Sequence, residues 1–252
     1  MARGAAARGK RIAFGDGKRI RWDQHSEMIF RGNPNIAPPT VSNASNLEWI
    51  AFYKGSRGYN RQGDGRWEWN LSFRSVPGEI FLSREEKAYA DLYARGSVLI
   101  EPNVPTFKLC SPNKQWPVDR YEQLSARLRA AGHTVVQFSY PGASYRLDRV
   151  QQIRTSTFRE ALAVLANAAL YIGPEGGLHH GAAAVNTPAV VLFGGFVPPA
   201  VTGYDTHTNL TGGVEACGSF KSCPHCLAAM QAISVDEVYA AAIERLAENE
   251  RV

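Results

Sequence analysis

The stretch Gly173-Pro174-Glu175-Gly176-Gly177-Leu178-His179-His180-Gly181-Ala182-Ala183-Ala184 decides the fold class of this chain. Apolar runs flank it at residues 169–172 and 189–194. A buried strand, a glycine-rich turn, an alanine-rich helix and a second buried strand form a βαβ unit of a parallel sheet. The turn joins a strand end to a helix start, where unpaired backbone N–H groups favour an anion.

Four residues of this turn suit a sugar phosphate. Gly176 and Gly177 allow close approach of the backbone, Glu175 is placed to hold sugar hydroxyls, and His180 is placed to hold a phosphate oxygen. A glycine-rich connection of this kind is also what any tight strand-to-helix turn needs. The neighbouring segments therefore have to decide between the two interpretations.

Length and composition indicate an ordinary globular chain. Its 252 residues are 44% apolar and 20% charged, and no apolar run approaches a membrane span, so we expect no transmembrane segment. Residues 1–10 are basic without an apolar signal core, which predicts a disordered lead-in. Four cysteines do not make a disulfide scaffold, and this predicts a cytoplasmic protein. The net charge of +5 suits an anionic ligand, an acidic surface or nucleic acid.

The chain changes character near residue 97. Residues 11–96 are rich in Gly, Asn, Arg and Trp, with short β-like pieces at 11–14, 48–53 and 79–82, a helix at 83–95 and a long loop at 55–74. Residues 97–252 alternate strands and helices regularly, with strands at 97–100 and 134–138 and helices at 118–131, 157–168 and 235–246. This alternation predicts a doubly wound sheet with its ligand at the carboxyl ends of the strands.

Three further groups of residues are candidates for function. Lys114, with Lys108 as second choice, lies before a helix and could meet a diphosphate. Trp67 and Trp69 have strand spacing and either pack or stack on a ligand. Three cysteines near the carboxyl end have only part of a zinc-site spacing, so reduced loop cysteines are the default and no metal is expected; they are Cys217, Cys223 and Cys226.

Together these motifs resemble glycosyltransferase family nine, the ADP-heptose:lipopolysaccharide heptosyltransferases. The Lys-x-Trp-Pro segment at 114–117 and the turn at 175–180 are similar to the family's two nucleotide-sugar motifs, and the cysteine-containing tail looks like its carboxyl end. Phe14-Gly15-Asp16 matches its early Gly-Asp. The turn carries Glu175 as its acidic residue and Gly176 where the family has Thr, and residues 141–146 lack the family's ribose-binding Glu.

The resemblance implies a GT-B-like α/β fold with a Rossmann-type doubly wound carboxyl-terminal half, at 97–252, and a reduced amino-terminal α/β half on the acceptor side, at 11–96. It implies an inverting, metal-independent glycosyltransferase with a nucleotide-diphosphate sugar as co-substrate and no other cofactor. Asp16 would be the catalytic base, and the donor-binding residues would be Lys114, Glu175, Gly176, Gly177 and His180.

The acceptor and the activity remain open at this point. A glycan or lipid-linked glycan is the expected acceptor, which would place the protein in the cytoplasm or at the inner membrane surface. The basic front half also suits a transferase acting on nucleic acid. The shortened amino-terminal half would equally suit a non-catalytic nucleotide-sugar-binding protein. Asp16, between two glycines, could instead cap a turn.

Overall fold

The computed structural model describes residues 1–249 apart from 52–57, 94 and 107. The chain divides into two compact units: Met1–Ser56 with Glu79–Arg84, and Arg57–Gly78 with Glu85–Val252. We call them the small unit and the large unit. Residues 52 and 53 of one expected strand and the start of the expected long loop lie outside the described residues.

The large unit is built on a six-stranded sheet with the order β10-β9-β8-β5-β6-β7, and every paired neighbour is parallel. The strands are β5 (Val98–Ile100), β6 (Val135–Ser139), β7 (Gln151–Arg154), β8 (Leu170–Pro174), β9 (Ala189–Leu192) and β10 (His207–Leu210). The order reverses between β5 and β8, so ligands are expected at the carboxyl ends of these two strands. The predicted Rossmann-type doubly wound sheet is confirmed.

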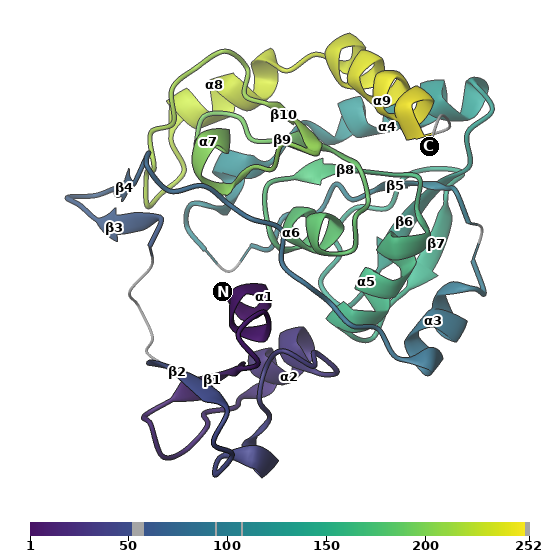
Figure 1. The fold of residues 1–252 in the computed structure, drawn as a ribbon. Coiled ribbons are helices and arrows are strands. Elements are labelled where there is room, and N and C mark those ends of the chain that lie inside the picture. Colours follow the sequence, from purple (N-terminus) through teal and green to yellow (C-terminus); the bar gives the residue numbers. More distant parts are fainter. Residues whose placement is uncertain (52–57, 94, 107, 250–252) are drawn as a thin grey trace. The chain divides into compact units, whose positions relative to one another are not determined.

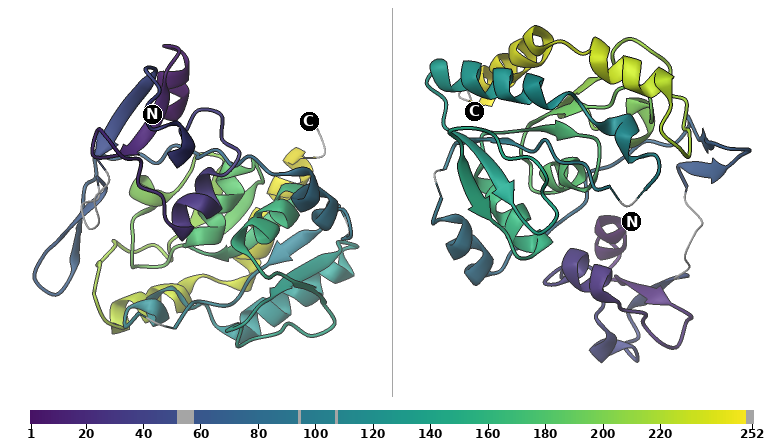
Figure 2. Two further views of the ribbon diagram at one scale, coloured as in Figure 1. Left: turned by 90° about the horizontal axis from the view of Figure 1, so that it is seen from below. Right: turned by 180° about the vertical axis from the view of Figure 1, so that it is seen from behind.

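Helices cover both faces of this sheet, as Figures 1 and 2 show. α4 (Val118–Ala130) and α9 (Val235–Asn249) pack together on one face, and α5 (Phe158–Asn167) and α6 (Gly177–Ala184) pack together on the other. β5, β8 and β9 are buried along their whole length because both of their faces are covered. The remaining helices of the unit are α3 (Arg84–Ala90), η2 (Ser111–Lys114), α7 (Pro199–Thr202) and α8 (Pro224–Ala232).

Local sequence explains where these helices begin and end. α5 starts at a capping box in which Thr157 and Glu160 exchange side-chain and backbone hydrogen bonds. α4 is followed by Gly132, whose φ of +92° lies in the left-handed region that glycine adopts without strain. Leu124 and Leu128 of α4 are fully buried against the sheet.

A hairpin belongs to the large unit although the sequence predicted a long loop at 55–74. β3 (Asn60–Gln62) and β4 (Trp67–Trp69) pair antiparallel. Trp67 N–H donates to the Gly218 carbonyl over 2.8 Å, and Phe220 N–H donates to the Gly65 carbonyl over 3.1 Å. The loop prediction is wrong because these hydrogen bonds to a distant segment stabilise a ribbon with little apolar periodicity.

The small unit contains a parallel strand pair, β1 (Arg11–Gly15) with β2 (Leu47–Ala51). Its helices are α1 (Ala2–Ala6), α2 (Gln24–Phe30) and the short η1 (Pro39–Val41). The expected disordered lead-in at 1–10 differs from the structure, because α1 forms there and buries Ala5. The expected strand at 79–82 is absent, since these described residues carry no strand.

No single described helix is long and apolar enough to cross a bilayer. α8 and α9 reach that length and apolarity only together, as a pair bent by 59°.

Candidate functional site

A cavity of about 1330 Å³ opens at the carboxyl ends of the sheet strands, and those of its lining residues that the structure describes belong to the large unit. The residues that follow three strands contribute to it: Glu101 after β5, Tyr140 after β6 and Glu175 after β8. The β3–β4 hairpin adds Trp67 and Trp69. The cavity therefore lies at the point where a doubly wound sheet is expected to bind its ligand.

The turn between β8 and α6 lies on this cavity. A Cβ placed on Gly176 would meet no described atom within 4 Å, and its φ of 166° is extended backbone that any residue adopts. Neither strain nor packing therefore requires glycine at 176, whereas a closely approaching ligand would. At Gly173 the reason is packing, because a Cβ there would lie 2.3 Å from the Tyr171 hydroxyl.

His179 caps the start of α6. Its Nδ1 accepts a hydrogen bond from Gly176 N–H over 2.9 Å, so its Nε2 carries the proton and donates to the Thr202 carbonyl, also over 2.9 Å. The ring is fully buried, and burial lowers the pKa of His179 below its ordinary value. This residue has a structural role that neighbouring His180 does not share.

Lys114 and Glu175 form an ion pair in the wall of the cavity. Only 21% of the Lys114 side chain and 7% of the Glu175 side chain are exposed. Burial would raise the pKa of Glu175, but the charge of Lys114 and its hydrogen bond outweigh it and hold the pKa below its ordinary value. The Lys114 ammonium also lies 5.1 Å from the centre of the Phe196 ring. The sequence thus names two residues that the fold brings into contact.

His180 lies on the cavity next to this pair. Its Nδ1 is 2.8 Å from the Tyr204 hydroxyl, and its Nε2 is 4.0 Å from a Glu175 oxygen. Burial lowers the pKa of His180 to about 4, so the ring is neutral at pH 7. The Tyr204 hydroxyl, whose pKa burial raises to about 12, donates to Nδ1 and leaves an Nε2–H donor.

Glu175, His179 and His180 place ligand atoms within 4.8 Å of one another, a spacing that a metal ion could bridge. Both ring nitrogens of His179 are engaged in hydrogen bonds, however, and Glu175 is paired with Lys114. A cation here would have to replace the Lys114 ammonium. The arrangement suits an anionic ligand better than a metal ion.

Trp116, in the same motif as Lys114, is buried rather than part of the cavity wall. It is fully buried, donates from Nε1 to the Ile233 carbonyl over 2.9 Å, and meets Tyr121 edge-to-face with ring centres 4.7 Å apart. Arg120 bonds the Ile233 carbonyl as well, over 2.6 Å. The tryptophan thus fixes the segment whose lysine faces the cavity.

Glu101 is a cavity residue that the sequence reasoning missed. It is 1% exposed, and its Oε1 accepts from Asn103 N–H over 2.9 Å and from the Asn103 side chain over 2.7 Å. Burial raises the pKa of Glu101 to about 7. Asn103 in turn accepts from Ser144 and Tyr145 N–H, each over 2.8 Å, and so holds the loop after β6. The sequence signal that could have identified Glu101 is an acidic residue directly after the apolar run 98–100.

The two tryptophans of the hairpin pack on other rings beside the cavity. Trp67 meets Phe220 edge-to-face at 5.1 Å between ring centres, and Trp69 meets Phe196 at 6.0 Å. These contacts show the packing role that was one of the two expectations, and both residues also line the cavity. Lys108 lines it too.

Asp16 belongs to the small unit and follows β1. Its Oδ1 accepts from Lys18 N–H over 3.0 Å and from Arg19 N–H over 2.7 Å, and Arg21 approaches to 3.5 Å. The Arg19 and Lys18 amides lower the pKa of Asp16. The structure thus shows the turn-capping role, and the role as catalytic base stays a prediction.

Comparisons with known proteins agree with the fold. The model of glycosyltransferase family 9 (heptosyltransferase) matches residues 66–218. A search of curated proteins finds no match. Among solved structures, ADP-heptose LPS heptosyltransferase II of E. coli matches with a TM-score of 0.52 at 21% identity, covering 69% of this chain and 54% of its own.

A second similar structure is the dodecameric iron-containing glycosyltransferase TibC from enterotoxigenic E. coli H10407. It has a TM-score of 0.53 at 19% identity and covers 69% of this chain and 51% of its own. TibC in complex with ADP-D-beta-D-heptose matches with a TM-score of 0.53 at 17% identity. This match covers 71% of the present chain and 52% of the TibC chain. The chain therefore spans about half the length of the solved structures that it matches.

Proposed function

The chain belongs to glycosyltransferase family 9, and on that premise we propose that it transfers a sugar from a nucleotide-diphosphate sugar to an acceptor hydroxyl, with inversion and without a catalytic metal. The observation that carries the proposal is the Lys114–Glu175 pair beside the start of α6, in a cavity at the carboxyl ends of β5 and β8. In the proposed complex, the diphosphate would lie beside the Lys114 cation and the sugar beside the Glu175 carboxylate.

The diphosphate would be held by groups that donate hydrogen bonds. The Lys114 ammonium has three donors and gives one to Glu175, which leaves donors for phosphate oxygens. His180 would contribute its Nε2–H, and the incoming negative charge would raise its pKa from about 4. Gly176 and Gly177 would let the phosphates approach the amino end of α6 closely.

These same groups would act on the reaction. When the bond to the anomeric carbon breaks, negative charge builds on the departing diphosphate, and preorganised donors stabilise it. Glu175 would hold the sugar hydroxyls while the anomeric carbon gains oxocarbenium character, by analogy with glycosidases. Asp16, by its resemblance to the family's early Gly-Asp, would take the proton of the acceptor hydroxyl.

An ADP-linked heptose is the first donor to test, because TibC was solved with ADP-D-beta-D-heptose. For the acceptor we propose a glycan or lipid-linked glycan, met in the cytoplasm or at the inner membrane surface. A nucleic-acid acceptor would instead require binding that falls steeply with salt. Tight nucleotide-sugar binding without any product would favour the non-catalytic alternative.

The test combines binding and turnover. Nucleotide sugars are screened by thermal shift, since a ligand that binds only the folded state raises Tm. Lys114→Met should weaken nucleoside-diphosphate binding roughly tenfold to a hundredfold, the value of one or two charge-assisted hydrogen bonds. Lys87→Ala, an exposed lysine on α3, is the matched control and should bind normally.

A folding control is needed because Lys114→Met leaves Glu175 buried and unpaired. The double variant Lys114→Met/Glu175→Gln removes that charge and should regain Tm while still binding the diphosphate weakly. Wild-type affinity in the double variant would exclude Lys114 from the phosphate site. Turnover that requires added Mg²⁺ or Mn²⁺ would contradict the metal-independent mechanism.

A further inference from the structure

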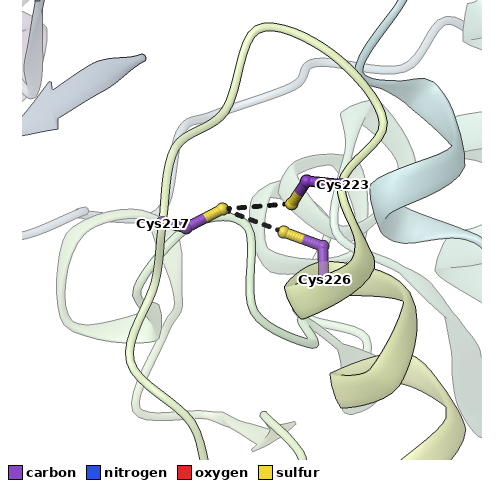
Figure 3. A group of neighbouring side chains, drawn as sticks. All are labelled: Cys217, Cys223 and Cys226. Carbon is purple, nitrogen blue, oxygen red and sulfur yellow. Dashed lines mark hydrogen bonds between the residues drawn. The ribbon is translucent and has the colours of Figure 1, made fainter. Parts of the chain in front are cut away.

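Three cysteines that are separated in sequence meet at one point of the large unit (Figure 3). Cys217 lies in the loop after β10, Cys223 is the N-cap of α8, and Cys226 lies in the first turn of that helix. The Cys217 sulfur is 3.5 Å from that of Cys223 and 3.1 Å from that of Cys226. All three sulfurs lie within 4.8 Å of one another, and Cys110 is outside the group.

The backbone around these cysteines is held by hydrogen bonds. The Gly195 carbonyl accepts from Cys217 N–H over 2.9 Å and from the Cys226 thiol over 3.2 Å. Cys223 N–H donates to Asn113 Oδ1 over 2.9 Å, and the Asn113 amide donates to the Lys221 carbonyl over 2.8 Å. The three sulfurs are therefore preorganised by contacts outside the cysteines themselves.

The spacing suits a thiophilic metal ion better than a disulfide. Tetrahedral coordination with metal–sulfur bonds of about 2.3 Å places sulfurs about 3.8 Å apart. The observed 3.1 and 3.5 Å need only a small expansion. A disulfide needs sulfurs about 2 Å apart and would leave the third cysteine unpaired. Thiols gain little from one another because they are weak donors and weak acceptors.

We propose that Cys217, Cys223 and Cys226 form a structural site for one thiophilic transition-metal ion, with zinc or iron as the candidates. Three thiolates are soft ligands that select these metals over magnesium or calcium. Binding exchanges three thiol protons for the cation without any redox change. Cys217 and Cys223 are only partly buried, so water can complete the fourth position.

The site would stabilise two walls of the cavity. Gly218, next to Cys217, accepts the Trp67 N–H that attaches the β3–β4 hairpin. Asn113, bonded to Cys223, precedes Lys114 in η2. A metal that fixes the cysteine loop therefore positions the hairpin and the lysine segment, although its ligands lie outside the proposed transfer chemistry.

The test measures metal, not activity. The whole 252-residue chain is purified under reducing conditions, reconstituted with zinc or with ferrous iron, and analysed for bound metal. One equivalent per chain is expected, and cobalt in its place should give a thiolate-to-metal charge-transfer band. Chelation should lower Tm and should increase hydrogen exchange in peptides covering 60–69 and 109–114.

Variants make the assignment specific. Cys223→Ser should fold, because serine is a favoured N-cap, yet should bind the metal more than about tenfold more weakly. Cys110→Ser, the matched control, should keep one equivalent. The proposal is overturned if four thiols titrate freely with equimolar zinc present. A disulfide among the three cysteines, found by mass spectrometry after the purified protein is alkylated without added reductant, would overturn it as well.

Discussion

Lys114 and Trp116 lie two residues apart in one motif, yet the lysine faces the cavity and the tryptophan the core. Lys114 is the last residue of η2 and Gln115 has extended backbone, so the alternation of a regular strand does not relate the two side chains. A motif of this kind therefore combines a ligand contact with the anchor that positions it. Only Lys114 can be replaced without opening the core, and Trp116→Ala would remove a large buried ring.

A second single residue, Glu101, predicts how the free energy of unfolding depends on pH. Its pKa is about 7 in the folded chain and about 4.5 ordinarily, so its protonated form stabilises the fold fully below pH 4.5. This stabilisation is lost as the pH rises through 7, and the difference between the two pKa values corresponds to about 3 kcal/mol. Urea unfolding at pH 5 and pH 8 measures this loss as the difference between the wild type and a variant that cannot ionise at position 101.

Glu101→Gln is the comparison variant, because its amide oxygen can still accept the two Asn103 hydrogen bonds but cannot ionise. The free energy of unfolding of the wild type, minus that of the variant, should fall between pH 5 and pH 8. The buried histidines have lowered pKa values, so the unfolded state binds more protons near pH 5 and their contribution to stability grows toward pH 8. This contribution is the same in both proteins and cancels in the comparison. Equal pH dependence in wild type and variant would show that Glu101 is not protonated in the fold.

At the scale of elements, α3 is attached to α5 by a buried ion pair. Arg159 Nε lies 2.6 Å from Glu86 Oε1, and its Nη2 lies 2.9 Å from Oε2. The side chains are 4% and 9% exposed. The sequence places Glu86 only within an expected helix at 83–95, whereas the fold gives it a bidentate partner from another helix.

Removing one partner of this ion pair should destabilise the fold. Glu86→Leu leaves the Arg159 charge buried, and we expect the free energy of unfolding to fall by about 3–5 kcal/mol. Glu86→Leu/Arg159→Met removes both charges and should be less destabilised than the single variant. Urea denaturation checks this. A double variant that loses as much stability as the single variants summed would mean that the two residues act independently.

At the scale of the whole molecule, the proposed donor site and the proposed base lie in different units. Kinetics can therefore separate them. Asp16→Asn should lower kcat by about 10²–10⁴-fold and leave donor affinity nearly unchanged, because a general base acts on the acceptor proton. The Asn oxygen can still accept the Lys18 and Arg19 amides, so the turn should persist.

Asp23→Asn is the matched control for this measurement. Asp23 caps α2 of the same unit through the Ser26 amide, over 2.8 Å, and asparagine caps as well as aspartate does. We expect its kcat to stay close to that of the wild type. Near-normal turnover of Asp16→Asn would leave Asp16 as a turn-capping residue only.

The sequence by itself determined the centre of the large unit. β8 and β9 are predictable because strands buried on both faces must be apolar throughout, and α5 because its cap and period are local. The glycine turn and the lysine motif are local patterns too. Each of these features depends on residues within one turn or one strand.

Other features of the fold and of the site were decided by the tertiary structure alone. β7 buries only Ile153 fully because it is an edge strand, and the β3–β4 hairpin depends on hydrogen bonds to residues 218 and 220. The pKa of Glu101 and the meeting of the three cysteines likewise arise from segments far apart in the chain. Burial and contact between such segments are properties of the folded chain, and local periodicity carries no record of them.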